Sequence, residues 1–281
     1  MAKNKLVMPV VKWVGGKRQI INLITKYVPK KFSTYYEPFV GGGAVLFELQ
    51  PKKAVVNDIN AELINIYEVI RDRVEELIGD LKQHRNEADY FYDIREKDRD
   101  KNEYSGWTPV QKALRIIYLN KTCYNGLFRV NKAGEFNAPF GYYVNPNIVN
   151  EITLRAVSIY FNKAKISFYC KDFEEVLKGA RKGSFVYLDP PYDPVSATSS
   201  FTGYDKGGFG KDEQIRLKKT CDKLNKQGIK FLLSNSATDF IQDLYLNKEY
   251  KIEVIQAKRV INSQADKRGE IDEVLVMNYE P

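Results

Sequence analysis

An α/β fold is predicted by three features of the 281-residue sequence. Short apolar runs of the buried-strand type alternate with segments whose apolar residues recur at helical spacing. Three glycines, Gly41–Gly43, separate a predicted strand from a predicted helix. Two further strands end directly in an aspartate, Asp58 and Asp189. The mean hydropathy of −0.44 is that of a globular protein, and no apolar run approaches the ~18 residues that a membrane span needs.

The predicted elements follow one another in a regular order. The first part of the chain has a strand at Tyr35–Glu37, a helix at Ala44–Leu49, a strand at Ala54–Asp58 and helical spacing over 61–85. From about residue 89 to residue 150 the pattern is irregular, apart from a helix around 110–120. The strand pattern then resumes at Ile166–Tyr169, Phe185–Leu188 and Ile229–Leu233, with a helix that carries Leu217, Cys221 and Leu224 on one face before Gly228. Residues 250–257 and 273–279 alternate like a closing antiparallel pair.

The charge distribution favours a polyanionic partner. Lys and Arg exceed Asp and Glu by 44 to 36, which gives a formal charge of +8 and a pI near 9.1. Residues 1–35 hold eight basic side chains and no acidic one, and residues 61–103 are acidic. In residues 112–150 five basic residues stand against the single acid Glu135 and are interleaved with aromatic residues. The second basic segment therefore fits a nucleic-acid surface better than a plainly solvated one.

The scarcity of histidine and cysteine excludes several chemistries. His84 is the only histidine, which removes Ser-His-Asp catalysis and multi-histidine zinc sites, and we expect it to be a solvated surface residue. The three cysteines lie far apart and fit neither a disulfide framework nor a metal site, and the first residues lead us to expect no signal peptide. We therefore expect a cytoplasmic protein without a bound metal.

The sequence Asp189-Pro190-Pro191-Tyr192, directly after a predicted strand, is the most specific signal. Two prolines end the strand and supply no N–H donors, so the Asp189 carboxylate and the Pro190 carbonyl form an acceptor site. Both groups can accept hydrogen bonds from one exocyclic amine, and the Tyr192 ring can stack on a planar base. A proline turn that merely ends a strand is the alternative.

The glycine turn and Asp58 suggest a nucleotide site, because a carboxylate at a strand end can accept hydrogen bonds from ribose hydroxyls. Glycine turns also occur for packing alone. Leu46 stands where a dinucleotide-binding G-x-G-x-x-G pattern needs its last glycine, which disfavours NAD. The segment around Lys17 lacks the upstream glycine and the following Ser or Thr of a phosphate-binding loop.

Four principal motifs occur in order along the chain: Lys12-Trp13-Val14-Gly15-Gly16-Lys17, Glu37-Pro38-Phe39-Val40-Gly41-Gly42-Gly43, Asn57-Asp58-Ile59-Asn60 and Asp189-Pro190-Pro191-Tyr192. In this order they resemble the motifs of Dam-type DNA adenine-N6 methyltransferases, and among them the DpnII-like enzymes. Three further segments also resemble this family: Tyr124-Asn125-Gly126-Leu127-Phe128-Arg129, Phe136-Asn137-Ala138-Pro139-Phe140-Gly141 and Phe201-Thr202-Gly203-Tyr204.

The resemblance implies a class I S-adenosylmethionine-dependent methyltransferase fold, with a Rossmann-like sheet and an inserted, mainly helical target-recognition domain. Residues 1–60 and 150–281 would form the catalytic domain that binds S-adenosylmethionine, and residues 61–149 the DNA target-recognition domain. The implied catalytic residues are Asp189, Pro190 and Tyr192. The implied cofactor-binding residues are Trp13, Lys17, Phe39, Gly41, Gly43, Asp58, Asp172, Phe173 and Asp189, although Trp13 could instead anchor the N-terminal segment in the core.

The implied reaction is direct methyl transfer to N6 of an adenine rotated out of double-stranded DNA, within GATC. The implied DNA-binding residues are Lys12, Tyr124, Asn125, Leu127, Arg129, Pro139 and Tyr143. Arg129 would pair with guanine, or alternatively contact a phosphate. Two alternatives remain: a glutamine or RNA amino-methyltransferase, which Asp189 and the basic aromatic segment disfavour, and a catalytically silent DNA-binding protein, which would need no cofactor. We expect a monomer or weak dimer of prokaryotic or phage origin, and the sequence leaves open whether a cognate restriction endonuclease exists.

Overall fold

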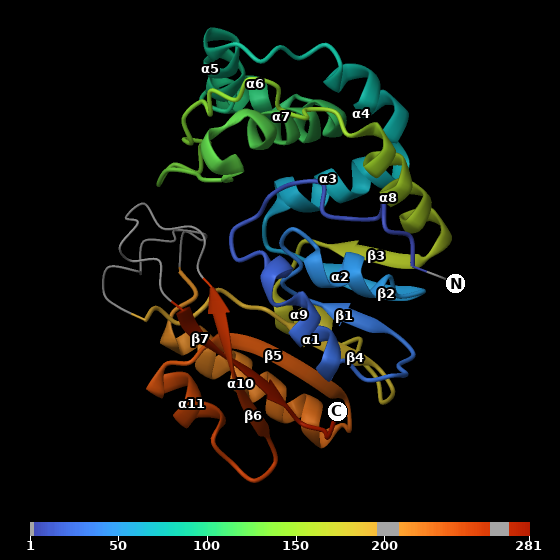
Figure 1. Ribbon diagram of the computed structural model, residues 1–281, viewed down its shortest axis with the longest axis vertical. Helices are drawn as coiled ribbons and strands as arrows, with labels where there is room; N and C mark the ends of the chain where they lie inside the picture. Colours follow the sequence, from blue (N-terminus) through green and yellow to red (C-terminus); the bar gives the residue numbers. More distant parts are fainter. Residues whose placement is uncertain (1–2, 196–207, 259–269) are drawn as a thin grey trace. The chain divides into compact units, whose positions relative to one another are not determined.

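The computed structural model describes residues 3–195, 208–258 and 270–281 (Figure 1). The chain divides into two compact units, each assembled from three separate segments. The first unit comprises Met1–Gly16, Val40–Lys52 and Asp58–Cys170, and the second comprises Lys17–Phe39, Lys53–Asn57 and Lys171–Pro281. The two units are defined by contacts within the chain and not by function. The division into a catalytic domain (residues 1–60 and 150–281) and a target-recognition domain (residues 61–149) remains a prediction.

A twisted sheet forms the centre of the second unit. Its strands are β1 (Tyr35–Glu37), β2 (Lys53–Asn57), β4 (Phe185–Leu188), β5 (Lys230–Ser236), β6 (Lys251–Lys258) and β7 (Glu270–Met277). They lie in the order β2-β1-β4-β5-β7-β6. The first four run parallel, whereas β7 is antiparallel to both β5 and β6, as the alternating C-terminal segments predict. This arrangement confirms the α/β class I methyltransferase fold.

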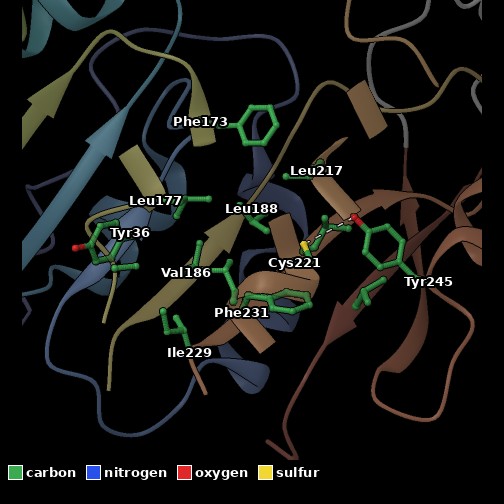
Figure 2. Packing of buried hydrophobic residues seen from close by; sticks show 14 of the residues in the cluster. Tyr36, Phe173, Leu177, Val186, Leu188, Leu217, Cys221, Ile229, Phe231 and Tyr245 are labelled. Atoms are coloured by element: carbon green, nitrogen blue, oxygen red, sulfur yellow. Dashed lines mark hydrogen bonds between the residues drawn. The ribbon is translucent and has the colours of Figure 1, made fainter. Parts of the chain in front are cut away.

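Helices cover the sheet of the second unit and complete its hydrophobic core. They are η1 (Lys17–Gln19), α1 (Ile21–Tyr27), α9 (Phe173–Leu177), α10 (Lys211–Lys226) and α11 (Asp239–Tyr245). Leu217, Cys221 and Leu224 form the buried face of α10, as their spacing predicts, and pack with Val186 and Phe231 of the sheet (Figure 2). All four residues of β4 are buried, which explains its uninterrupted apolar sequence.

The strand order creates a switch point at which a ligand can approach the sheet. β1 pairs with β2 on one side and with β4 on the other. In parallel α/β sheets ligands bind beyond the carboxyl ends of the strands at such a point. Pro38 follows β1 and Asp189 follows β4, so both predicted motifs begin there.

The first unit is mainly helical. It contains α2 (Ala44–Leu49), α3 (Ala61–Asp72), α4 (Val74–Leu81), α5 (Ala88–Glu96), α6 (Lys101–Ser105), α7 (Pro109–Thr122), η2 (Tyr124–Gly126), α8 (Glu151–Lys163) and the strand β3 (Lys165–Tyr169). Asn60 caps α3 through the N–H of Leu63, and Thr108 and Gln111 form a capping box at α7.

Two details of the predicted helices are wrong. The single helix expected over 61–85 is two helices, because Arg73 leaves the helical conformation (φ −136°, ψ 34°) and joins α3 to α4. The supposedly irregular region after residue 89 contains α5 and α6 as well as the expected helix, α7. Both additional helices are short, with one buried residue in α5 and none in α6, so the helical spacing of apolar residues is a weak signal there.

His84 is not the solvated residue expected from its charged surroundings. It is half-buried and stacks on Tyr118 with ring centroids 4.5 Å apart. Its Nδ1 atom lies 2.9 Å from the Tyr90 hydroxyl, and burial lowers the pKa of the imidazole. His84 therefore packs the segment that follows α4 against Tyr118 of α7.

No helix within the described ranges is both long and apolar enough to cross a membrane. In the same ranges no group of three or more His, Cys, Asp or Glu side chains is arranged to hold a metal ion.

Candidate active site and nucleic-acid interface

In the first unit, Asp58 is bound to the glycine turn. Its Oδ2 accepts a hydrogen bond from the N–H of Gly41 at 3.0 Å, and its Oδ1 accepts one from the N–H of Asn60 at 2.9 Å. Burial raises the pKa of Asp58 to about 6, although both N–H groups favour the ionised form. Each carboxylate oxygen can accept a further hydrogen bond, so the ionised side chain can still receive two hydroxyl donors.

The glycine turn brings backbone close to its neighbours. Gly41 and Gly43 have φ angles of +48° and +73°, which side chains rarely adopt. A Cβ atom at Gly43 would lie 2.8 Å from the Phe47 ring. The Tyr67 hydroxyl donates to the Gly41 carbonyl at 2.5 Å and holds the turn in place.

Asn120 of α7 joins the segment containing Lys12 to the loop after the helix. Its side chain accepts a hydrogen bond from the Lys12 N–H and donates to the carbonyls of Lys12 and Gly126, each at 2.8 Å. Gly126 has a φ of +64°, and a Cβ there would lie 2.6 Å from Cδ of Lys12. Trp13 stacks on Phe128 at 4.5 Å, so it anchors the N-terminal segment on this loop.

Residues 122–141 fold back on themselves as a two-stranded segment, which we call the hairpin. Bridges join Cys123 to Phe140 and Val130 to Phe136. The hairpin brings together the predicted DNA-binding residues Tyr124, Asn125, Leu127, Arg129 and Pro139, and Tyr143 follows it. Tyr124 is 60% exposed, and the side chain of Tyr143 is also exposed. The hairpin therefore presents aromatic and basic side chains to solvent.

Arg129 is exposed but already oriented by the opposite strand of the hairpin. Its Nε donates to Oδ1 of Asn137 at 2.7 Å, and its Nη2 donates to the Asn137 carbonyl at 2.9 Å. Asn137 donates its own N–H to the Arg129 carbonyl. Because Nη1 takes part in neither bond to Asn137, the outer edge of the guanidinium can pair with a guanine or a phosphate.

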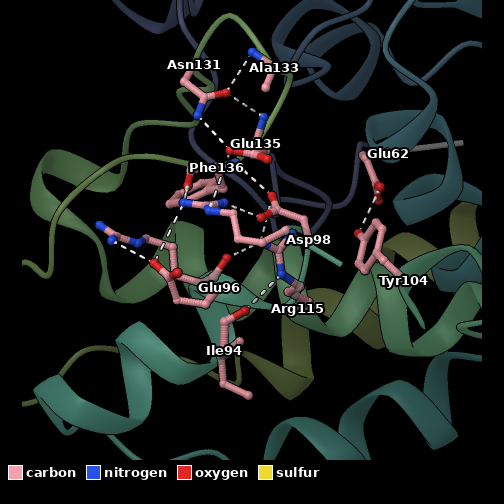
Figure 3. A network of polar contacts seen from close by, with 12 residues as sticks. Glu62, Ile94, Glu96, Asp98, Tyr104, Arg115, Asn131, Ala133, Glu135 and Phe136 are labelled. Carbon is pink, nitrogen blue, oxygen red and sulfur yellow. Dashed lines mark hydrogen bonds and ion pairs between the residues drawn. The ribbon is translucent and has the colours of Figure 1, made fainter. Parts of the chain in front are cut away.

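A buried ion-pair network supports the hairpin (Figure 3). Asp98 is 5% exposed and accepts a hydrogen bond from the Phe136 N–H at 2.7 Å. Asp98 also pairs with Arg99 and with Arg115, which is 1% exposed and lies 2.8 Å away. Arg99 donates to the Phe136 carbonyl at 2.9 Å, so both backbone groups of Phe136 are bound. Arg115 also donates to the Ile94 carbonyl at the end of α5.

In the second unit, Asp189 is held at the carboxyl end of β4 by two donors. Lys17 Nζ lies 3.0 Å from Asp189 Oδ1, and the Ser234 hydroxyl donates to the same oxygen at 2.8 Å. Burial raises the pKa of Asp189, whereas the Lys17 ammonium and the Ser234 hydroxyl oppose that shift. Lys17 also lies over the Tyr192 ring, 4.2 Å from its centroid.

The loop after Asp189 is anchored by buried polar side chains. Gln214 donates to the Pro191 carbonyl at 2.9 Å and accepts a hydrogen bond from the side chain of Asn235. Asn235 in turn accepts a hydrogen bond from the Asp193 N–H at 3.1 Å. The Tyr192 hydroxyl donates to Glu273 of β7 at 2.7 Å. These contacts anchor the residues that directly follow Pro190, whose carbonyl is the predicted acceptor.

Three predicted cofactor residues have structural contacts of their own. Asp172 caps α9 through the Glu174 N–H and pairs with Arg216 at 2.7 Å. Phe173 is buried in the core, and its ring centroid lies 5.4 Å from that of Phe39. These contacts account for helix capping and packing, and a role in cofactor binding stays a prediction for all three.

Four important polar residues were missed in the sequence: Asn120, Asp98, Ser234 and Asn235. Asn120 and Asp98 lie among many polar residues, so nothing local distinguishes them. Ser234 and Asn235 carried a usable signal, because they are polar residues continuing an apolar strand. The predicted motif Phe201–Tyr204 lies outside the described residues.

A parallel sheet with an antiparallel C-terminal pair, a glycine turn tied to an aspartate, and the sequence Asp-Pro-Pro-Tyr after β4 fit the α/β class of methyltransferases. Residues 13–261 match the family model of the D12 class N6 adenine-specific DNA methyltransferases. The chain belongs to this family, and it is an adenine-specific DNA methyltransferase.

The relatives that the chain matches include type II methyltransferases and DNA adenine methylases. The type II methyltransferase M1.LlaDCHI of Lactococcus lactis subsp. cremoris is 42% identical over 99% of this chain and 98% of its own. The type II methyltransferase M.MjaIII of Methanocaldococcus jannaschii is 45% identical over 97% and 99%. The DNA adenine methylase of Escherichia coli K12 is 32% identical over 100% and 97%.

Proposed function

We propose that the chain transfers a methyl group from S-adenosylmethionine to N6 of an adenine that is rotated out of double-stranded DNA, within the sequence GATC. The observation that carries this proposal is the Asp189 carboxylate, which Lys17 and Ser234 hold at the end of β4, directly before Pro190 in the chain. The base has to leave the stack because its amino group is otherwise paired.

The acceptor site activates the amine by withdrawing it from conjugation with the adenine ring. Asp189 and the Pro190 carbonyl accept one N–H each, which favours a tetrahedral nitrogen with an available lone pair. Bound S-adenosylmethionine supplies an electrophilic methyl group on a sulfonium, so no covalent enzyme intermediate is needed. The protein contributes alignment and stabilisation of the positive charge that develops on N6. The methylated amine becomes acidic, and its proton can leave late to Asp189 or to water.

The residues of the first unit fit the ribose of the cofactor. Ionised Asp58 can accept hydrogen bonds from two hydroxyl groups. The positive φ angles at Gly41 and Gly43 favour glycine, so neither position carries a side chain that would fill the space beside the turn. Trp13 is proposed as a neighbour of the same ligand. In the second unit we assign Lys17, Phe39, Asp172, Phe173 and Asp189 to the cofactor and Tyr192 to stacking on the target base.

The hairpin is proposed to read the DNA, with residues 61–149 acting as the target-recognition domain. Arg129 would pair with guanine, while Leu127 and Pro139 would contact a thymine methyl group. Tyr124 would occupy the space left by the flipped adenine. The further assigned contacts are Lys12, Asn125 and Tyr143. Such an enzyme would act on DNA in a prokaryotic cytoplasm, in some systems beside a cognate restriction endonuclease.

A methyl-transfer assay on plasmid DNA tests the proposal. Purified protein is incubated with unmethylated plasmid and radiolabelled S-adenosylmethionine, and nucleosides are identified by mass spectrometry. N6-methyladenine in GATC, with protection from an endonuclease that this methylation blocks, is expected. Methylation at another sequence would refute the GATC assignment. Cofactor binding with methylation of RNA or protein only, or DNA binding without cofactor binding, would refute the proposed function.

A further inference from the structure

We propose that Ser234 is a positioning residue for methyl transfer: its hydroxyl binds Oδ1 of Asp189 and holds the carboxylate in the rotamer that receives the substrate amine. This inference rests on the proposed function of Asp189 as the amine acceptor. It assigns a task to a residue on β5, outside every motif that the sequence singles out.

The sheet register places Ser234 beside Asp189. β4 and β5 are parallel and pair Leu188 with Leu233, so the next residues along the two strands are Asp189 and Ser234. Ser234 is fully buried and donates to Oδ1 at 2.8 Å. Lys17 reaches the same oxygen at 3.0 Å. Two donors from different elements therefore bind Oδ1, and the nearby Tyr192 also favours the ionised form of Asp189.

The hydrogen-bond direction at Ser234 follows from its proton count. An ionised carboxylate only accepts, and a serine hydroxyl has one proton, so that proton belongs to the bond with Asp189. The Tyr187 hydroxyl, 3.0 Å from Ser234 Oγ, must then donate to Ser234. Burial raises the pKa of Tyr187 well above its usual value, so it stays protonated. A one-way chain thus runs from Tyr187 through Ser234 to Asp189.

This chain fixes the carboxylate more firmly than Lys17 alone can. Lysine is a flexible point charge with rotatable donors, whereas Ser234 and Tyr187 project from adjacent buried strands. The charged and titratable groups that face Asp189 are Lys17, Tyr187, Tyr192 and, beyond Tyr192, Glu273. Loss of the Ser234 donor leaves these groups in place and removes one interaction that favours ionised Asp189.

The test is single-turnover methylation at saturating DNA and cofactor, measured across pH. Ser234→Ala is expected to slow methyl transfer roughly ten- to a hundredfold, since small displacements of a reacting group cost about that much. The acidic limb of its pH–rate profile should move to higher pH, because Asp189 loses a donor to its ionised form. Dissociation constants for DNA and cofactor should stay within about twofold, because neither ligand is proposed to touch Ser234.

Ser184→Ala is the matched control. Ser184 is also buried, but it precedes β4 by one residue and lies about 16 Å along the strand from Asp189. It should match the wild type in rate and pH profile. Equal behaviour of Ser234→Ala and Ser184→Ala would overturn the proposal.

Tyr187→Phe provides an independent variant in case Ser234→Ala does not fold. It should shift rate and pH profile in the same direction by a smaller amount, and an unchanged profile would contradict the chain. The double variant should equal Ser234→Ala, since Tyr187 acts through Ser234, whereas additive losses would overturn that relation. A wild-type protein that methylates no DNA would instead refute the proposed function itself.

Discussion

If Asp58 contacts the ribose as proposed, the affinity for S-adenosylmethionine should depend on pH. Burial raises its pKa from 3.8 to about 6 in the free protein, so the folded state favours the protonated side chain. The contribution of protonated Asp58 to the free energy of unfolding is therefore fully present below about pH 4, and it is lost as the pH rises through about 6. Ribose hydroxyls donate hydrogen bonds, so a bound cofactor would favour the ionised form of Asp58 over the protonated form. Cofactor binding should then strengthen over the same interval in which the free protein loses stability.

The size of the effect follows from the ionised fraction of Asp58. With a pKa of about 6, roughly one-tenth of the side chain is ionised at pH 5 and nine-tenths at pH 7. If only the ionised form binds the ribose, the dissociation constant falls about tenfold between these values, or ~1.4 kcal/mol.

Isothermal titration calorimetry at pH 5, 6 and 7 measures this dependence. Asp58→Asn is the matched variant, since it has similar size and no titrating proton. Asp58→Asn should bind the cofactor more weakly than the wild type at pH 7, and its affinity should not change between pH 5 and 7. His84 is present in both proteins, so any contribution from its titration is common to both. Wild-type affinity that is flat between pH 5 and 7, or an equal slope in Asp58→Asn, would refute the assignment.

Three further substitutions test other parts of the structure. Arg129→Ala should lose about 1–3 kcal/mol of discrimination at one base pair, measured as methylation kinetics on GATC and its single-base variants; equal proportional losses on every duplex would indicate a phosphate contact instead. Gly43→Ala should lower the free energy of unfolding in urea by about 1–3 kcal/mol, because of its positive φ and the nearby Phe47 ring, and an unchanged midpoint would contradict this. Asp98→Asn should cost roughly 3–5 kcal/mol by leaving buried Arg115 uncompensated, so wild-type stability in thermal unfolding would show that the network is not important.

The parts of the fold that could be predicted have strong local signals. β4 is fully buried and therefore uniformly apolar, and the proline pair after it marks its end. The buried face of α10 could be predicted because one side of the helix packs on the sheet, which places apolar residues at helical spacing at Leu217, Cys221 and Leu224. The parallel order of the strands is not a local property, and it enters the prediction through the resemblance to a family.

The parts that could not be predicted depend on contacts between distant segments. Asp98 is one acid among many in a polar region, and only the fold places it under the hairpin. Ser234 becomes a partner of Asp189 only through the register of β4 and β5. His84 is polar by sequence, yet Tyr118, more than thirty residues later, covers its ring.

Asp189 is the group on which the proposed chemistry depends most. The most direct measurement is the single-turnover rate of Asp189→Ala on a GATC duplex, with DNA binding and thermal unfolding followed in parallel because Lys17 loses its partner. The expected result is loss of more than nine-tenths of the wild-type rate, a barrier increase above ~1.4 kcal/mol, with DNA affinity largely intact. A folded, DNA-binding variant that retains more than about a tenth of that rate would remove Asp189 from the chemistry.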